Sequence, residues 1–404
     1  MGSETKKPLT NTLITLMAIA IGINVANLYY LQPLLHQITS EFHVGTARAT
    51  NLLTLTQIGY ALGLAFILPL GDIWPRRRLA VAIFAVSAVF VGIAATLTSF
   101  ALLALVMLII GLSSIGGQVM IPLAADLAEP DQRGRVIGKV MSGLLIGVLL
   151  SRTASGLLAE VAGWRAVYWT AAGLLAVMAF VLYNVLPTEP ARAKVAYRKL
   201  VAGVFSLFVT HSQLRRRAYL GALIFASNST LWTTLSFLLA GSPFHYSNAV
   251  IGLFGLFGVA GVLAANLAGR QADRQRTRLS TIVAAVLLLG AFGLLALGRD
   301  SLLFLAIGIM VLDTGMQGMQ ITNQSVIYTL LPEWRSRINS AYMVSGFAGA
   351  SVGSFLAGQL YAHFGWYGDC WLGGVLGVML LVPALLWRST TEPTNVVSVV
   401  DDAR

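Results

Sequence analysis

Long apolar segments alternate with short polar breaks along the whole chain. Each segment has about 20 residues, the length that a helix needs to cross a hydrocarbon core of about 30 Å. Runs such as 279–297 lack the alternation of apolar and polar residues that a membrane β-strand shows. The pattern predicts twelve membrane-spanning helices, at residues 12–36, 48–70, 79–98, 101–126, 136–160, 165–186, 218–241, 249–269, 279–297, 302–330, 337–362 and 368–388.

The second half of the chain repeats the first about 202 positions later. Gly163 and Trp164, for example, return as Gly365 and Trp366. Two repeated membrane halves that face each other suggest alternating access to a site between them. The sequence therefore predicts an all-α integral membrane protein, with twelve transmembrane helices in two pseudo-symmetric six-helix bundles around a central cavity.

The polar breaks divide the chain into four expected parts. These are an N-terminal bundle at 1–187, a cytoplasmic linker at 188–217, a C-terminal bundle at 218–388 and a cytoplasmic tail at 389–404. Within the linker, the apolar stretch 201–209 is flanked by positive charge. It predicts either a short helix on the membrane surface or a partly ordered connection.

The chain is basic, with 27 Lys and Arg residues against 16 Asp and Glu residues and a formal net charge of +11. Most basic residues fall in the termini, the linker and the loops on one predicted side, which is the positive-inside pattern. This pattern predicts a multi-pass protein of the inner (plasma) membrane with both termini in the cytoplasm. The charge therefore requires no nucleic-acid partner, and we expect a monomer. With a single cysteine, Cys370, we expect neither an internal disulfide nor a metal site.

Two loops, one in each half, place a carboxylate beside several arginines. Their residues are Asp72, Arg76 and Arg77 after the second helix, and Gly269, Asp273 and Arg274 after the eighth helix. Carboxylate–guanidinium pairs can lock neighbouring helices together, so that breaking them would act as a conformational switch. These loops resemble the motif Gly-x-x-x-Asp-Arg/Lys-x-Gly-Arg-Arg/Lys of the major facilitator superfamily. Within that superfamily, the chain resembles the proton-coupled drug and sugar efflux permeases (arabinose-efflux-permease-like).

The chain departs from that subgroup in two places. Met107 stands where those antiporters typically carry an arginine in the fourth helix, so the usual coupling residue is absent. In the fifth helix, residues 151–156 (SRTASG) replace the typical Gly-Pro pattern. Proton coupling would therefore need other ionisable groups.

Asp313 is the acidic residue that the predicted spans place near mid-membrane, and Arg152 is its basic counterpart. An ionisable group at this depth costs several kcal/mol unless it is paired or hydrated. The resemblance implies that the fifth helix packs near the eighth and tenth. We therefore expect Arg152 and Asp313 to pair across the two halves, and protonation of Asp313 to weaken the pair and couple proton movement to opening. The alternatives are a permanent ion bridge that does not titrate, or contacts to other partners.

Polar side chains gather on the first helix of each three-helix unit, and the resemblance implies that these four helices line the central cavity. On the tenth helix they share one face with Asp313. Amides with aromatic rings suit a neutral or weakly charged ligand that has an apolar body, whereas the alternative for each amide is a structural contact between helices. The expected cavity residues are Asn24, Asn27, Tyr30, Gln32, Ser114, Gln118, Asn228, Ser229, Trp232, Thr233, Gln317, Gln320 and Gln324.

These features predict a secondary active transporter that works by alternating access, with proton-coupled efflux of small drug-like or sugar-like organic molecules as the leading interpretation. A proton symporter or uniporter for a small organic solute is the alternative, and a membrane enzyme is a remote one. The sequence has neither clustered catalytic residues at a membrane face nor a phosphate-binding loop. The expected partners are the lipid bilayer, protons and a small-molecule substrate, and the proton gradient, rather than a cofactor, is the expected energy source.

Overall fold

A computed structural model describes residues 10–129, 131–187, 196–259, 277–330 and 335–386. Within these ranges, nine helices are long and apolar enough to cross a membrane. One of them, α7, contains two spans, because its backbone leaves the helical conformation at Gly163. Two shorter apolar helices, Asn11–Ala26 and Asn248–Gly258, occupy the expected first and eighth positions. The protein is thus all-α, with twelve transmembrane helices in two bundles around a central cavity.

The spans are interrupted where the sequence carries proline or glycine, so that several consist of two or three consecutive elements. The first half contains α1 (Asn11–Ala26), η1 (Gln32–Leu34), α2 (Leu35–Phe42), α3 (Thr46–Leu62), η2 (Gly63–Ile67), η3 (Leu68–Asp72), α4 (Arg76–Thr96), α5 (Phe100–Ser113), α6 (Gly116–Leu127) and α7 (Arg133–Val185). The second half contains α8 (Tyr197–Thr210), α9 (Ser212–Ala240), α10 (Asn248–Leu253), η4 (Phe254–Gly258), α12 (Thr277–Leu297), α13 (Leu302–Leu330), α14 (Arg335–Phe364) and α15 (Trp366–Leu386).

The sequence repeat reappears in the backbone. Gly163 and Gly365 both have positive φ, at 79° and 63°, which glycine adopts without the steric cost that a side chain would add. Each allows the chain to reverse between two neighbouring spans. In both halves an arginine also ties two helix ends together: Arg77 donates to the carbonyl oxygen of Tyr183 at 2.5 Å, and Arg278 to that of Leu385 at 2.9 Å.

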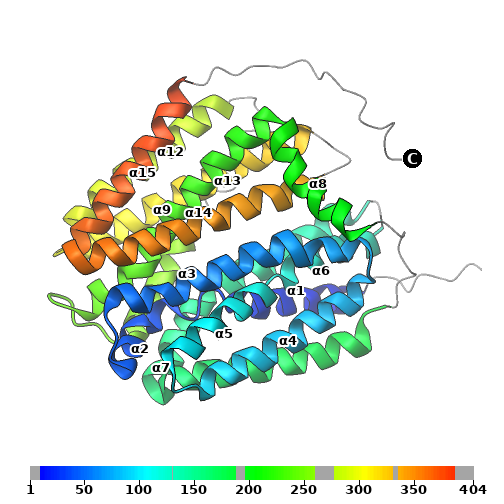
Figure 1. Cartoon of the computed structure of the whole chain (residues 1–404), viewed down its shortest axis with the longest axis horizontal. Coiled ribbons are helices and arrows are strands. Elements are labelled where there is room, and N and C mark those ends of the chain that lie inside the picture. The colour runs from blue at the N-terminus through cyan, green and yellow to red at the C-terminus, as the bar shows by residue number, and fades with distance from the viewer. Residues whose placement is uncertain (1–9, 130, 188–195, 260–276, 331–334, 387–404) are drawn as a thin grey trace, which may run out of the picture.

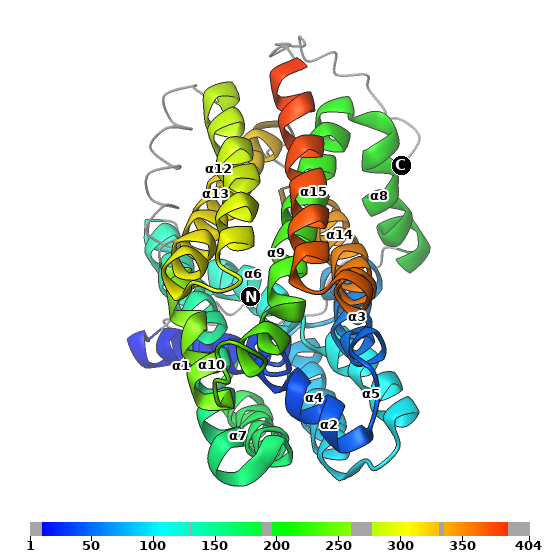
Figure 2. The same cartoon turned by 90° about the vertical axis from the view of Figure 1, so that its left-hand side faces the viewer.

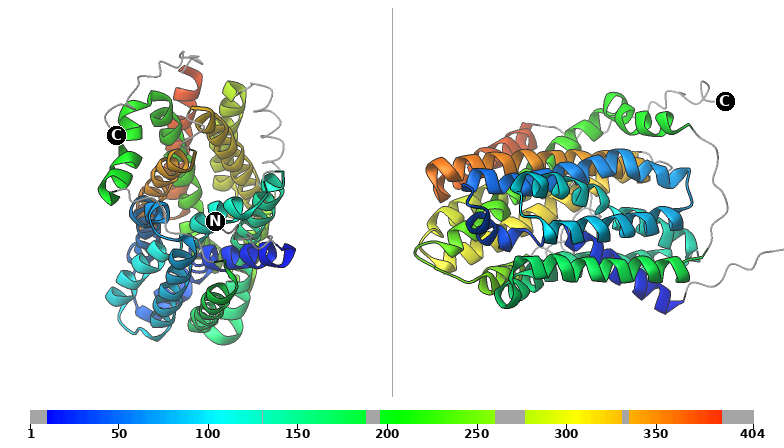
Figure 3. Two further views of the ribbon diagram at one scale, coloured as in Figure 1. Left: turned by 90° about the vertical axis from the view of Figure 1, so that its right-hand side faces the viewer. Right: turned by 60° about the horizontal axis from the view of Figure 1, so that its bottom comes forward.

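The two halves lie one above the other in Figure 1 and meet at two helix crossings. Figure 2 shows α10 next to α7 at one crossing and α14 next to α3 at the other. We call the end of the bundle that carries α8 the linker end, and the end that carries α2 the far end; they lie on the right and the left of Figure 1. Figure 3 shows the linker end in its left panel.

The connection between the halves forms a helix, α8, which confirms that the apolar stretch 201–209 is helical. Its buried side chains, Leu200, Val204 and Leu207, share one face. The hydroxyl of Tyr197 at the start of α8 donates to the carbonyl oxygen of Phe66 at 2.6 Å, which attaches the helix to the first half. The next helix, α9, begins at Ser212, so part of the expected linker at 188–217 belongs to the following span.

Candidate functional site

Arg152 lies at the boundary between the two halves, on α7, and its side chain is only 5% exposed. The guanidinium carbon sits 4.8 Å from the centre of the Tyr29 ring and 3.9 Å from that of the Trp232 ring. Its Nε donates to Oε1 of Gln32 at 2.5 Å. Cation–π contacts with two aromatic faces stabilise a charge that has left water. The first half thus inserts a buried cation against α9 of the second half.

Asp313, on α13, is also buried, and its Oδ1 accepts a hydrogen bond from Nδ2 of Asn228 at 3.1 Å. Asp313 and Arg152 interact electrostatically, but they do not form the direct ion pair that the sequence predicts, because no nitrogen of Arg152 lies within 4.0 Å of the carboxylate. The guanidinium lies over the rings of Tyr29 and Trp232 instead. The indole Nε1 of Trp232 lies near the carboxylate without hydrogen-bonding geometry.

Glycines on α10 and η4 make room for both charged side chains. A Cβ at Gly255 would lie 2.9 Å from Cβ of Arg152, and one at Gly258 would lie 3.1 Å from Oδ2 of Asp313. Gly252 approaches the backbone of Arg152 in the same way, with its Cβ position 2.5 Å from the carbonyl oxygen. Only glycine permits this close crossing of α7 and α10, so the two ionisable groups depend on it for their positions.

A narrow pocket, which has about 220 Å³ of unfilled space including the part open to solvent, adjoins Arg152 between the halves and forms the smaller cavity. Its lining residues are Gln32, Pro33, Arg152, Trp232, Leu235, Ser236 and Ile251. Two of these residues carry a polar atom, Nε1 of Trp232 and Oγ of Ser236, that is buried without a hydrogen-bond partner in the described part of the chain. Unsatisfied buried donors of this kind are uncommon and call for an explanation.

Three hydrogen bonds also join the two halves directly. Thr54 on α3 donates to Oγ of Ser354 on α14 at 3.2 Å. Near α2, Nδ2 of Asn248 donates to Oε1 of Gln37 at 3.3 Å, and Thr153 donates to the carbonyl oxygen of Gly252 at 3.0 Å. The bond between Asn248 and Gln37 joins the halves at the far end, and the other two join them near the depth of Arg152 and its repeat equivalent Ser354.

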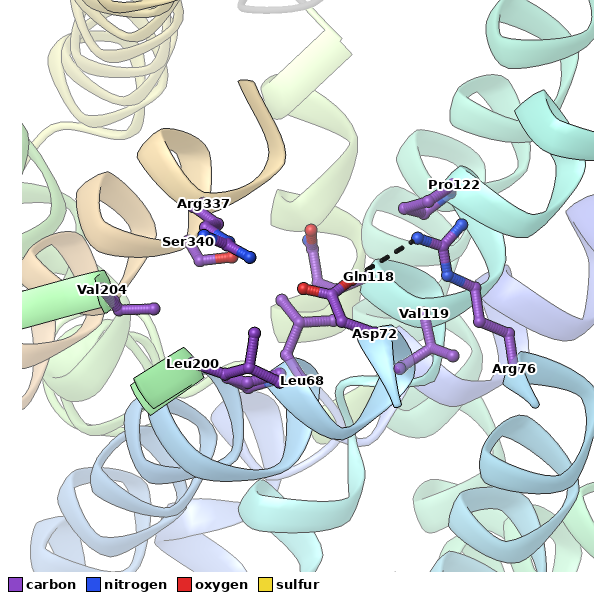
Figure 4. Close-up of a pocket in the computed structure, with 12 residues that line it drawn as sticks. Leu68, Asp72, Arg76, Gln118, Val119, Pro122, Leu200, Val204, Arg337 and Ser340 are labelled. Carbon is purple, nitrogen blue, oxygen red and sulfur yellow. Dashed lines mark ion pairs between the residues drawn. The ribbon is translucent and has the colours of Figure 1, made fainter. Parts of the chain in front are cut away.

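A larger cavity of about 430 Å³, partly open to solvent, lies at the linker end (Figure 4). Its wall on the side of the first half includes Asp72, Arg76 and Gln118, and the opposite wall includes Arg337 and Ser340 of α14 (Figure 4). Helix α8 borders the same cavity (Figure 4). The far end is therefore closed and the linker end holds the wider space. In alternating access, each of the two main states is closed at one end and more open at the other, as this structure is.

The predicted switch residues of the first half are at the edge of the larger cavity. Nη1 of Arg76 donates to Oδ2 of Asp126 at 2.7 Å, and its Nη2 lies 3.9 Å from Oδ1 of Asp72. Arg77 contacts Tyr183 rather than Asp72. The carboxylate lock therefore involves Asp126, which the sequence analysis did not include. The second set, Gly269, Asp273 and Arg274, lies outside the described residues.

The structure separates the predicted cavity residues into groups with different surroundings. Gln32 and Trp232 line the smaller cavity and Gln118 the larger one. Ser229 bonds to Gln57 of the first half at 2.8 Å. The remaining residues of the set border neither cavity: Asn24, Asn27, Tyr30, Ser114, Asn228, Ser229, Thr233, Gln317, Gln320 and Gln324.

Some of these polar side chains make structural bonds instead. Oδ1 of Asn24 accepts from the backbone N–H of Gly116 at 2.7 Å, next to the break between α5 and α6. Ser114 donates to a carbonyl of its own helix at 2.7 Å, and Gln324 donates to Oδ1 of Asn339 at 3.3 Å. Asn27 is buried with both amide atoms unpaired among the described residues.

Two contributors to the site, and one buried carboxylate outside it, escaped the sequence analysis. Tyr29 forms one wall of the Arg152 site. Because the chain leaves the α-helix after α1, helical spacing could not predict the direction in which the Tyr29 side chain points. Gln57, in the middle of the second span, carried a usable signal, since an amide at that depth is uncommon. Asp369 is 2% exposed and accepts a hydrogen bond from Thr234, although its place at the start of the last span indicated a surface position.

Comparison with known proteins gives matches along the whole chain. The family model described as Major Facilitator Superfamily matches residues 17–349 and 218–401. The uncharacterized transporter YgaY of Escherichia coli O157:H7 is 45% identical over 94% of this chain and 95% of its own. The chloramphenicol resistance protein of Streptomyces lividans is 25% identical over 93% and 95%. A bacterial homolog of the human lysosomal transporter Spinster, in an inward-facing and occupied conformation, superposes with a TM-score of 0.74 at 15% identity, over 95% and 96% of the two chains.

Proposed function

Because the chain belongs to the major facilitator superfamily, and is thus a multi-pass membrane transporter rather than an enzyme, we propose that it exports small organic molecules by alternating access in exchange for protons. The proposal places it in the inner membrane with the linker end in the cytoplasm. In the structure the wider cavity is at the linker end and the far end is closed. This conformation would be the one that receives substrate from the cytoplasm.

The observation that carries the proposal is that Asp313 and Arg152 lie near each other without forming an ion pair. Both are buried at the boundary of the halves, and each is held by neutral partners instead of by the other. Two buried charges in a low-dielectric site strongly influence each other even without contact. Protonation of Asp313 would remove one of them and leave Arg152 unbalanced. The free energy of the closed boundary would then depend on whether Asp313 carries a proton.

The direction of transport rests on a different observation. A relative that covers almost the whole chain is named for chloramphenicol resistance, and export is the simplest way in which a transporter confers resistance. For the present chain this supports export of a drug-like molecule. It does not depend on the geometry of the ionisable pair, so the direction and the coupling can be tested separately.

The coupling test uses purified protein in vesicles with an imposed pH gradient and a pH-sensitive dye. Chloramphenicol heads the compound panel. In the wild-type protein, addition of a substrate should move protons. Asp313→Asn should abolish this movement while exchange of labelled against unlabelled substrate, measured without a gradient, continues. Asp369→Asn is the matched control, because Asp369 is equally buried but bonds within one half, to Thr234.

The outcomes separate the alternatives. Proton movement that persists in Asp313→Asn would overturn the assigned coupling residue. Substrate movement without proton movement in the wild-type protein would indicate a uniporter. A loss of substrate exchange in both carboxylate variants would show a general effect on folding, which the thermal stability of the purified variants would report.

A further inference from the structure

Helix α8 presents an apolar row to the outside of the protein, on a different face from the residues that it buries. Ala202, Phe205 and Val209 follow the spacing i, i+3 and i+7, so their side chains share one side of the helix. All three are exposed, Phe205 by 44% and Val209 by 80%. A row of exposed apolar side chains beside a packed helix face indicates contact with a second apolar medium.

The orientation of α8 differs from that of the membrane-spanning helices. It runs across the direction of α3 and α14 at the outer edge of the linker end (Figures 1 and 2). It contacts α14 of the second half and the elements η2 and η3 of the first. Because the spans cross the membrane, a helix that lies across them at their ends lies along the membrane surface.

The apolar row of α8 continues an exposed row of the second span. Ile58, Leu62 and Phe66 recur every four residues and are all exposed, so they form one apolar face of that span. Such a face on a membrane-spanning helix contacts lipid, which is as apolar as these side chains. The ring centre of Phe205 lies 6.4 Å from that of Phe66. The acyl chains that cover Phe66 therefore also reach Phe205.

Basic side chains border the apolar row. Arg198 precedes Ala202 by one helical turn, and Lys199 shares the remaining, polar side of the helix with Ser206. Arg198, Lys199 and Ser206 are all exposed. Long basic side chains can keep their stems on an apolar surface while their charged ends reach the lipid headgroups. A helix with this division of apolar and basic sides is suited to the surface of an anionic membrane.

We propose that α8 is a binding surface for anionic phospholipid. Phe205 and Val209 insert among the acyl chains, and Arg198 and Lys199 contact the phosphate groups. Leu200 and Val204 of the same helix line the larger cavity, so the lipid binds an element that forms part of the cavity wall. The interaction involves no residue of the Arg152 site, so it can fail while proton coupling holds, and the reverse.

Fluorescent labels at two exposed positions of α8 test the insertion. Val209→Cys and Ser206→Cys, each in a Cys370→Ser background, carry the same environment-sensitive dye in full-length protein in lipid vesicles. Phospholipids with a nitroxide on the acyl chain should quench the label at position 209 more strongly than the label at 206, and aqueous iodide should do the opposite. A label on Val352→Cys, at an exposed position in the middle of α14, gives the value for full lipid contact.

The other results of this experiment would each overturn the insertion. Equal quenching of the two labels by the nitroxide lipid, or stronger iodide quenching at position 209, would place the apolar row in water. Protection of the label at 209 from both quenchers would show that a protein surface, and not lipid, covers the row.

The headgroup preference is measured with the nitroxide on phosphatidylglycerol or on phosphatidylcholine at equal mole fractions. The lipid near Val209 should be enriched in phosphatidylglycerol by about 2- to 5-fold, the factor expected for one basic residue at the headgroups. Arg198→Gln with Lys199→Gln should remove the enrichment, as should high salt, which screens exposed charges. Arg133→Gln with Arg135→Gln is the control, because it removes two exposed charges at the start of α7. The proposal is overturned if the α8 pair leaves the enrichment unchanged, or if both pairs lower it equally.

Discussion

Arg152 and Ser354 occupy corresponding positions in the two repeats, and each reaches into the opposite half. Arg152 lies in the crossing of α7 with α10, where Gly255 makes room for its side chain. Ser354 lies in the crossing of α14 with α3, where it accepts a hydrogen bond from Thr54. The repeat has thus kept the position and changed the chemistry, with a buried cation at one crossing and a neutral hydroxyl at the other.

Because the two crossings differ in chemistry, one can hold the halves together while the other responds to protons. The crossing at Ser354 has a hydroxyl hydrogen bond from Thr54, and Ser354 also accepts one from Thr233 of its own half at 3.0 Å. These groups do not titrate in the physiological range. The crossing at Arg152 lies near Asp313 and therefore responds to protons under the proposed mechanism. Under that mechanism, one crossing would hold the closed state through neutral hydrogen bonds, and the other would sense protons.

Removal of the Thr54 hydroxyl should favour opening of the far end. Thr54→Val keeps the shape but loses the bond to Ser354, so the open population should rise about 2- to 10-fold. The rate at which an impermeant maleimide labels Ile251→Cys, in a Cys370→Ser background, measures this population, because Ile251 is buried in the closed state. Thr230→Val is the control, since Thr230 bonds within α9. Equal labelling rates in the two variants would contradict a role for Thr54 in closure.

A cross-link between the halves near α2 should stop transport. Gln37 and Asn248 are in direct contact in the closed state, so cysteines at these positions, in the Cys370→Ser background, should react with a short bifunctional thiol reagent. We expect the cross-linked protein to bind substrate from the linker end but not to release it. Cleavage of a reducible linker should restore the wild-type rate. Full transport by quantitatively cross-linked protein would show that the far end does not need to open.

Hydropathy and the repeat were sufficient to predict the fold. About 20 apolar residues must form a helix in a membrane, because no water is there to satisfy the backbone. The same repeat identified Gly163 and Gly365, and both prove to have positive φ. The number and order of the helices therefore followed from hydropathy and the repeat.

The site was predicted only in part, because its contacts join distant parts of the chain. Arg152 and Asp313 were found from the cost of charge in the membrane, yet their pairing was wrong. The sequence does not encode locally that the Arg152 guanidinium lies over the rings of Tyr29 and Trp232. The bond between Gln57 and Ser229, which lie 172 positions apart, likewise depends on how the halves meet in one conformation.

Close packing of α14 on α9 should make Gly349 intolerant of even a methyl group. A Cβ there would overlap the backbone of Ala222, so Gly349→Ala should reduce stability by about 1–3 kcal/mol. Gly374→Ala provides the control, because no atom lies within 4 Å of its Cβ position; alanine there should be neutral or stabilising, since it favours a helix by up to about 1 kcal/mol. Thermal unfolding of both variants in the same detergent checks the difference. Equal melting temperatures would show that the helices can separate without cost.

Arg152→Lys should distinguish the charge of Arg152 from its shape. Lysine keeps the positive charge, but it lacks the planar group that lies over the rings of Tyr29 and Trp232 and bonds to Gln32. We expect proton movement to persist, while the concentration for half-maximal transport rises about 2- to 30-fold, as expected from the loss of a desolvated cation–π contact. Arg152→Met, which also removes the charge, should abolish proton movement. Initial transport rates and dye signals measured on the same vesicles test both effects. If the lysine and methionine variants behave alike, the geometry of the guanidinium is the essential property, and its charge does not account for coupling.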